Sequence, residues 1–152
     1  MNASIASMAL IGGLLLSVAV AAGETTAYTG TTKTVVSKST LPLGNGDSVV
    51  AAVSRGMATL STTPPILLEL NCTGLGLLGA NQSYAADFYC SLEADADNVL
   101  DLKGTESADG SHFTVLGGSG RWQGASGGGT FKRLTGSDTE ASAAFEMTIT
   151  TP

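Results

Sequence analysis

Few side chains in this 152-residue sequence have the types and spacing that catalysis or metal binding requires. His112 is the one histidine, and it follows an Asp-Gly turn at the edge of a predicted strand, where we expect a solvated imidazole. Two cysteines far from it in sequence do not complete a ligand set, so we expect no metal site. Ser119 stands between glycines, but no strand-turn-helix pattern surrounds it as in a nucleophile elbow. The sequence therefore names no catalytic residue.

Four residues are better suited to binding a ligand than to reacting with one. Tyr84 and Phe88 share the apolar face of an alternating run, so they belong either to a packed core or to a cavity wall. Arg121 and Trp122 interrupt a glycine-rich run. Trp122 could line the mouth of a cavity while Arg121 contacts a polar ligand head; alternatively, the indole fills one end of the fold and the guanidinium lies at the surface. We treat all four as candidate ligand-binding residues.

Cys72 and Cys90 are the two cysteines, and each lies in a run of alternating apolar and polar residues. An even count in an exported chain predicts a disulfide, and two buried free thiols are the alternative. The two runs suggest an antiparallel hairpin that turns within residues 79–83. If the cysteines face each other directly, the register also places Leu70 opposite Leu92.

Strands must position these residues, because period-two alternation recurs along most of the chain. Residues 48–60 are predicted to be a strand interrupted at Arg55-Gly56 by a bulge, with a helix as the alternative. Residues 25–32 are expected to be a loosely held lead-in. About eight strands, close turns and no long helical window favour an antiparallel barrel or sandwich. The other predicted strands cover residues 34–40, 66–72, 84–92, 99–105, two extended runs within 111–134, and 141–150.

Glycine is concentrated in one stretch, SHFTVLGGSGRWQGASGGGTFKRL, at residues 111–134. Glycine permits positive φ and close approach of two backbones, and small curved sheets bend at such positions. The later part of the stretch, around Gly128, could be only a flexible turn. The residues that we expect to serve the structural role are Gly117, Gly118, Gly120, Gly124 and Gly127.

The composition indicates one folded domain, and the N-terminal residues indicate an export signal before it. Hydrophobic residues make up 43% of the chain and charged residues 13%, which argues against disorder, and a net charge of −6 disfavours nucleic acid and anionic membranes as partners. Residues 1–22 are predicted to be a signal peptide, because residues 8–22 form an uncharged apolar run that ends in small residues. No Lys or Arg precedes this run, and a retained anchor is the alternative. Cleavage would leave residues 23–152 secreted or periplasmic, without a membrane segment.

The order of several motifs resembles that of the allene oxide cyclase-like superfamily, which includes the dirigent proteins. The glycine pattern that those families carry late in the chain stands here at residues 117–127 as GGSGRWQGASG. A Leu-Gly-Asn-Gly-Asp turn at residues 43–47 precedes it, as do an aromatic strand at 84–90 and a Gly-Thr pair at Gly104. The resemblance covers residues 42–134.

This resemblance implies a single eight-stranded antiparallel β-barrel of the calycin type, assembled as a dimer or trimer. It also implies that the barrel cavity binds a small hydrophobic molecule, or steers its cyclisation or coupling, without a metal or an organic cofactor. The cyclases place a carboxylate, an asparagine and a proline near the start of their barrel. Residues 34–43 offer Pro42 but no Asp, Glu or Asn, so we transfer no catalytic residue.

Three functions remain open at this point. The first is binding of a small hydrophobic molecule in the cavity, and the second is a cofactor-free cyclase, isomerase or coupling-directing activity in the same cavity. The third is a solid-core structural or surface-interaction protein. We expect an interior that is at least partly open, because inward-facing residues mix a few aromatic side chains with glycine and alanine.

Overall fold

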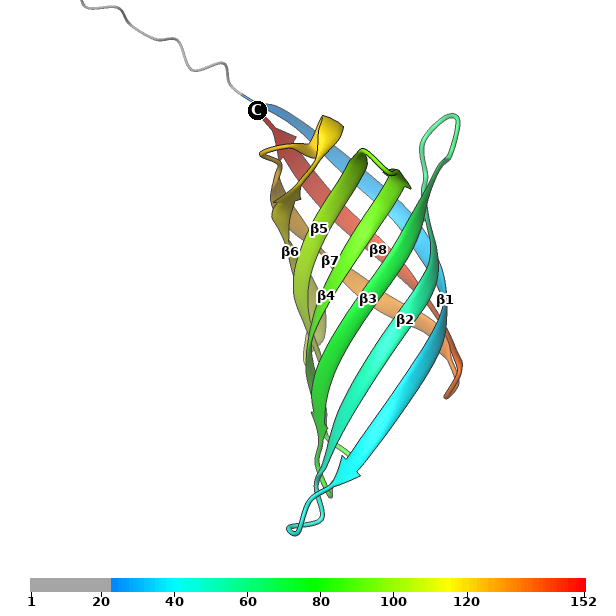
Figure 1. Ribbon diagram of the computed structural model, residues 1–152, viewed down its shortest axis with the longest axis vertical. Coiled ribbons are helices and arrows are strands. Elements are labelled where there is room, and N and C mark those ends of the chain that lie inside the picture. Colours follow the sequence, from blue (N-terminus) through cyan, green and yellow to red (C-terminus); the bar gives the residue numbers. More distant parts are fainter. Residues whose placement is uncertain (1–22) are drawn as a thin grey trace, which may run out of the picture.

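A computed structural model describes residues 23–152, and the predicted signal peptide lies outside the described residues. The described chain forms a closed barrel of eight antiparallel strands whose spatial order is their order in sequence (Figure 1). The predicted all-β antiparallel barrel is therefore confirmed, and the sandwich alternative is wrong. Within this part of the chain, no helix has the length and apolar character that crossing a membrane would need.

Short turns connect the strands, and one 3₁₀ turn lies between the sixth and seventh of them. Each strand is at least nine residues long, so the barrel is tall relative to its turns. The elements are β1 (Glu24–Pro42), β2 (Ser48–Leu60), β3 (Ile66–Leu78), β4 (Tyr84–Asp95), β5 (Asn98–Ser107), β6 (Gly110–Gly118), η1 (Gly120–Trp122), β7 (Ser126–Gly136) and β8 (Glu140–Thr151).

The hairpin of β3 and β4 has the register that the two cysteines predict. Cys72 lies directly opposite Cys90, and Leu70 lies opposite Leu92. The two sulfur atoms form a disulfide, so the alternative of two free thiols is wrong. Because side chains alternate between faces along a strand, this single pairing places every apolar residue of the hairpin's alternating set toward the barrel interior.

The first strand is longer than the sequence indicates. Residues 25–32, expected to be a lead-in, belong to β1, whose first part pairs with β8 from Glu24 to Val35. Threonine fits a half-buried strand well, but threonine and glycine at inward positions such as Thr26 and Gly30 conceal the apolar alternation. This part of β1 closes the barrel against the last strand.

The second strand is also more regular than expected. Both of its ladders keep their register through Arg55 and Gly56, so the predicted bulge and the alternative helix are both wrong. A glycine is required at position 56 for a different reason: a Cβ there would fall on the carbonyl oxygen of Lys33 in β1. The residue marks close contact of two backbones rather than a break in the strand.

The glycine-rich stretch contains both kinds of glycine that its pattern predicts. Gly117, Gly120, Gly124 and Gly127 have positive φ, between +57° and +136°. Gly118 has an ordinary φ, but a Cβ on it would fall on the carbonyl oxygen of Val99 in the facing strand β5. Positive φ at four of these positions and a close backbone contact at Gly118 are conditions that favour glycine over other residues.

Gly128, however, is not part of a flexible turn. It lies in β7 and pairs with Thr114 of β6 and Thr148 of β8. The ladder between β6 and β7 has three paired positions, which end at His112 and Thr130. Past Thr130, β7 continues beside β8 to Gly136.

Candidate ligand-binding cavity

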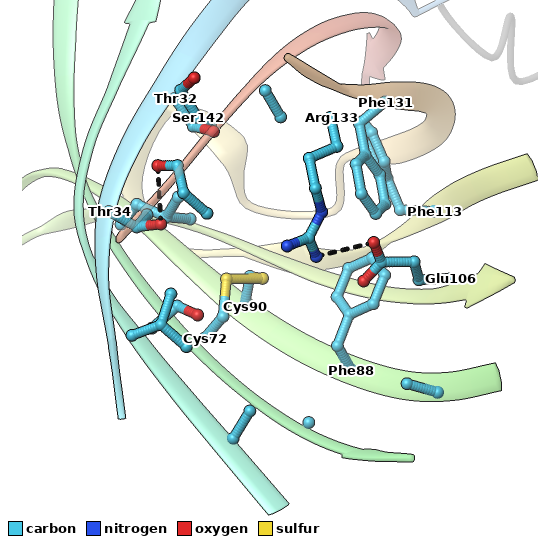
Figure 2. Close-up of a pocket in the computed structure, with 18 of the residues that line it drawn as sticks. Thr32, Thr34, Cys72, Phe88, Cys90, Glu106, Phe113, Phe131, Arg133 and Ser142 are labelled. Carbon is cyan, nitrogen blue, oxygen red and sulfur yellow. Dashed lines mark hydrogen bonds and ion pairs between the residues drawn. A yellow bond between two sulfur atoms is a disulfide. The ribbon is translucent and has the colours of Figure 1, made fainter. Parts of the chain in front are cut away.

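One half of the barrel interior is hollow. The cavity has a volume of about 630 Å³ and is lined by inward-facing residues from β1 to β8. Aliphatic and aromatic side chains make up most of its wall, together with the Cys72–Cys90 disulfide (Figure 2). The larger apolar side chains on the wall include Leu70, Leu92, Phe88, Phe113, Phe131 and Phe145.

Glycine determines where the largest of these side chains can lie. Phe88 of β4 faces Gly74 of β3 and Gly104 of β5, and a Cβ on Gly104 would overlap the Phe88 ring. The ring therefore lies over the neighbouring strand, where it meets Phe131 edge-on at a centroid separation of 5.5 Å. Such an edge-to-face pair stabilises by about 0.5–1.5 kcal/mol beyond its buried area. The two rings, whose planes are 78° apart, form an apolar corner on one side of the cavity.

An ion pair stands next to this aromatic surface. Nη2 of Arg133 in β7 donates a hydrogen bond of 2.8 Å to Oε1 of Glu106 in β5 (Figure 2). The Glu106 side chain is 20% exposed and the Arg133 side chain 50%, so the carboxylate is the more buried member. The pair joins β5 and β7, which are not neighbouring strands. It lies beyond Thr130, where the ladder between β6 and β7 has ended. It brings two opposite charges into a mostly apolar wall.

Tyr84 extends this polar group. It lies on β4 two residues from Ala86, which faces Glu106, so its side chain is a diagonal neighbour of the carboxylate. Burial raises the pKa of the Tyr84 phenol above its usual value, and the negative charge of Glu106 raises that pKa further while Arg133 lowers it. The phenol therefore keeps its proton at neutral pH and can donate a hydrogen bond into the cavity.

Hydroxyl groups line the part of the wall formed by β1 and β8. Thr32, Thr34 and Ser142 are the residues that contribute them (Figure 2). Thr34 donates a hydrogen bond of 3.3 Å to the Ala141 carbonyl, and Ser142 shares one of 2.7 Å with Thr135. These groups are already partly engaged, so they make the wall mildly polar without introducing charge.

A second ion pair stands at the rim. Nζ of Lys38 is 3.5 Å from Oδ1 of Asp138, and the Asp138 side chain is fully exposed. Both residues line the cavity, so the cavity reaches solvent beside them. The pair is worth little energetically, because exposed ion pairs typically contribute about 0–1 kcal/mol.

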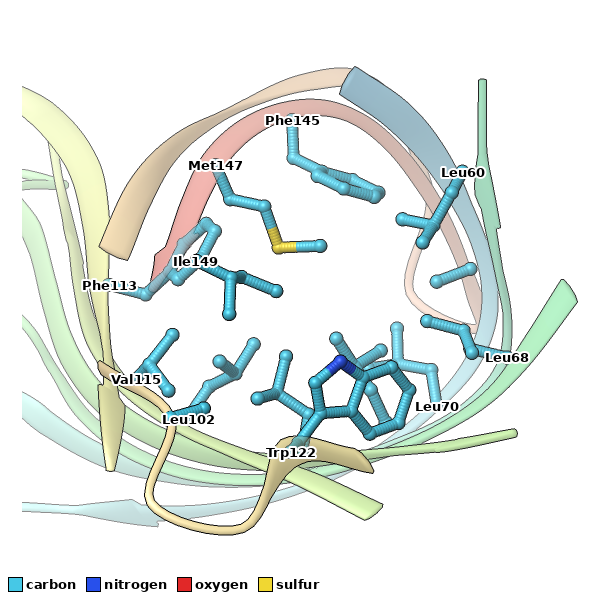
Figure 3. Packing of buried hydrophobic residues seen from close by; sticks show 14 residues of the cluster. Leu60, Leu68, Leu70, Leu102, Phe113, Val115, Trp122, Phe145, Met147 and Ile149 are labelled. Atoms are coloured by element: carbon cyan, nitrogen blue, oxygen red, sulfur yellow. The ribbon is translucent and has the colours of Figure 1, made fainter. Parts of the chain in front are cut away.

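The other half of the interior is filled, and Trp122 covers its end. Trp122 is 6% exposed and packs in a cluster that includes Leu68 and Ile149 (Figure 3). The η1 turn places the indole there, since Gly118 and Gly120 let the chain approach β5 closely. This is the arrangement in which the indole fills one end of the barrel.

The four residues singled out from the sequence therefore separate into two pairs. Tyr84 and Phe88 line the cavity, as the cavity-wall interpretation expects. Arg121 and Trp122 are not among its lining residues: the Arg121 guanidinium lies on the outer side, 4.2 Å from the centroid of the Trp122 ring. His112 is an exposed strand residue, with Nε2 3.1 Å from Oγ1 of Thr105.

Sequence reasoning missed the two charged residues in the cavity. Glu106 continues the inward alternation of Leu100 and Leu102, and Arg133 continues that of Phe131. The predicted strand stops at residue 105, one position too early to include the glutamate. Among residues 23–152, no three His, Cys, Asp or Glu side chains come together as a metal site.

Comparison with known proteins gives a fold relationship. No family model and no curated protein sequence matches the chain. Among solved structures, the chain is similar to a pterocarpan synthase dirigent protein, with a TM-score of 0.56 and 12% sequence identity over 98% of each chain. At this identity the similarity concerns the backbone. The chain thus has the eight-stranded antiparallel barrel fold of the dirigent proteins.

Proposed function

We propose that this protein binds a small hydrophobic molecule in its barrel cavity. The observation that carries the proposal is a volume of about 630 Å³ with aromatic and aliphatic walls and a few polar groups. Small-molecule sites typically combine these features at this size. The hollow half also counts against the solid-core structural alternative, since a barrel that served only as a scaffold would gain stability from filling it.

The division of the interior supports the same proposal. The buried cluster around Trp122 supplies a core, so the fold does not depend on filling the other half. A barrel can thus keep a cavity that would be costly if it were the whole interior. On one side of that cavity, β2, β3 and β4 keep continuous ladders, which hold their lining side chains in fixed positions.

A cofactor-free cyclase, isomerase or coupling-directing activity is the second candidate. It is favoured by the presence of Glu106 and Tyr84 in one apolar cavity, because a carboxylate and a phenol can exchange protons with a bound molecule. Incubating candidate substrates with wild type and with Glu106→Gln would test it. Equal product distributions for the two proteins and for buffer alone would exclude catalysis by this carboxylate.

Filling the cavity should weaken ligand binding without unfolding the barrel. Ala143 lines the cavity opposite Thr32 and beside Arg133. We expect Ala143→Trp to weaken binding of the neutral fluorescent probe phenylnaphthylamine by about tenfold or more, since the indole occupies space that the probe needs. Fluorescence titration gives the affinity, and thermal melting checks the fold.

Ala144→Trp is the matched control, because the next residue of β8 points to the other face of the sheet. It should leave probe affinity unchanged. If the interior is packed instead of open, Ala143→Trp should cost about 1–3 kcal/mol of stability through overpacking. That destabilisation, from a wild type that binds no probe, would favour the structural-protein alternative.

Export and assembly are further parts of the proposal. A disulfide is usual in oxidising compartments, which supports a secreted or periplasmic location. The N-terminus of the exported protein should lie near Ala22 or Gly23, and an intact Met1 in a soluble cytosolic fraction would contradict export.

On the outer face of β1 to β3, Leu41 and Leu75 are exposed by more than 60%, which favours a homo-oligomer. Native mass spectrometry would give the subunit number and reveal any co-purified ligand.

A further inference from the structure

We infer that the Glu106–Arg133 pair makes the cavity selective for uncharged ligands that carry a hydroxyl or carbonyl group, and that Glu106 excludes carboxylates. This inference rests on the proposed function, since it names the class of molecule that the cavity takes. The assignment makes Glu106 a specificity-determining residue. It follows from the balance of charges on the wall, from the burial of the pair, and from the apolar surface beside it.

The charges that line the cavity cancel. Two cations, Lys38 and Arg133, and two acids, Glu106 and Asp138, contribute to its described wall. Each cation is within ion-pair distance of one acid. A carboxylate that enters therefore meets no cation whose charge is uncompensated, and it must give up its own hydration to enter an apolar space.

The position of the acid strengthens this exclusion. Glu106 is less exposed than Arg133, so the negative end of the pair faces the protected part of the cavity while the positive end is better hydrated. An anionic head that approaches Arg133 comes close to Glu106 as well, and like charges at such separations repel strongly where water is scarce. Binding an anion would require the existing ion pair to rearrange.

An uncharged polar head encounters none of these costs. Arg133 uses one N–H in its bond to Glu106, and a guanidinium carries five donors. Glu106 keeps a second carboxylate oxygen as an acceptor, and the protonated Tyr84 hydroxyl can donate. A ligand hydroxyl could accept from one of these groups and donate to another while the ion pair stays intact.

The apolar part of the ligand has a matching surface next to the pair. Phe88 and Phe131 flank Arg133 and Glu106 in the close-up view (Figure 2), and their rings are 5.5 Å apart. An apolar body that packs against these rings brings its polar substituent to the ion pair. The site thus fits a ligand with an apolar body and one uncharged hydroxyl or carbonyl group.

Two probes that share a ring system test the inference. Naphthylmethanol and naphthoate differ in the charge of the polar head, and naphthoate is ionised at pH 7. We expect wild type to bind the alcohol about tenfold more tightly than the carboxylate, from a charge effect damped by partial exposure. Glu106→Gln should shift the affinity ratio toward naphthoate by about tenfold or more, because it frees Arg133. Isothermal titration calorimetry measures all the affinities.

Asp101→Asn is the matched control, because it removes one acidic charge from the outer face of the same strand. It should leave the ratio of the two affinities unchanged. Arg133→Gln provides an independent reading should Glu106→Gln fail to fold: it leaves Glu106 uncompensated and should widen the preference for the alcohol.

The outcomes separate this inference from the proposal beneath it. Equal binding of both probes by wild type, or a ratio that neither cavity variant changes, would overturn the charge selection while leaving the proposed function intact. If wild type binds neither probe, the proposed function fails, and the inference fails with it.

Discussion

Trp122→Ala should lower the free energy of unfolding by about 3–5 kcal/mol, the usual cost of truncating a buried tryptophan. The indole is 6% exposed and covers the end of the filled half of the barrel, in the buried cluster that contains Leu68 and Ile149. Alanine would leave a void lined by those side chains and open the core to water. Because domains of this size are stable by about 5–15 kcal/mol, the loss is a large fraction of the total. Urea denaturation followed by circular dichroism measures it.

Arg121→Ala is the control that separates packing from the interaction with the indole's outer face. The guanidinium lies over the Trp122 ring but is exposed, and an exposed cation–π contact contributes about 0.5–1 kcal/mol. The two substitutions should therefore differ severalfold in cost. Similar small losses for both would show that Trp122 does not hold the end of the barrel together.

Gly120→Val should be comparably destabilising, by about 4 kcal/mol. Its φ of +57° resists a β-branched side chain at about 1–3 kcal/mol, and steric overlap adds about 1–3 kcal/mol. A Cβ at this position would overlap the Asn98 side chain, which accepts a hydrogen bond from the Arg121 backbone N–H. The substitution thus disturbs the turn that positions Trp122. Thermal and urea denaturation both report the loss.

Gly44→Val controls for adding a β-branched side chain to a turn. Nothing lies within 4 Å of a Cβ at Gly44, and its φ is outside the positive range. The variant should melt within a few degrees of wild type, since surface substitutions are usually within about 0.5 kcal/mol. If Gly120→Val melts at the same temperature as Gly44→Val, the backbone at Gly120 is not constrained as described.

The barrel could be predicted from the sequence because apolar and polar residues alternate visibly in most of its strands. In β3 and β4 every second residue is apolar, and two cysteines on that face fix the register. The first half of β1 could not be found in this way, since its inward positions hold Thr26 and Gly30. Its place depends on pairing with β8, which a local pattern does not report.

The candidate site was only partly predictable, for a related reason. Tyr84 and Phe88 follow the apolar alternation, and that alternation places them on the lumen side. Glu106 and Arg133 also follow it, but a charged residue at the end of a strand usually faces solvent. Their ion pair joins β5 and β7, which are not neighbouring strands, so it depends on how the barrel curves between them. The position of the Trp122 side chain could not be predicted from strand alternation either, because a 3₁₀ turn and not a strand directs it.

The unequal ladder lengths have a consequence for how the chain closes on itself. Seven of the eight pairings join consecutive strands, whereas β1 with β8 joins residue 24 to residue 151. Loop-closure entropy rises with the logarithm of contour length, so this closure costs about 2 kcal/mol more than a hairpin about a tenth as long. It has twelve paired positions to offset that loss. The β6–β7 ladder, with three, closes a local segment whose entropic cost is small. The ladder that closes the barrel is thus four times as long as the β6–β7 ladder and nearly as long as the thirteen-pair ladders of β1–β2 and β2–β3, although forming it removes the most chain freedom.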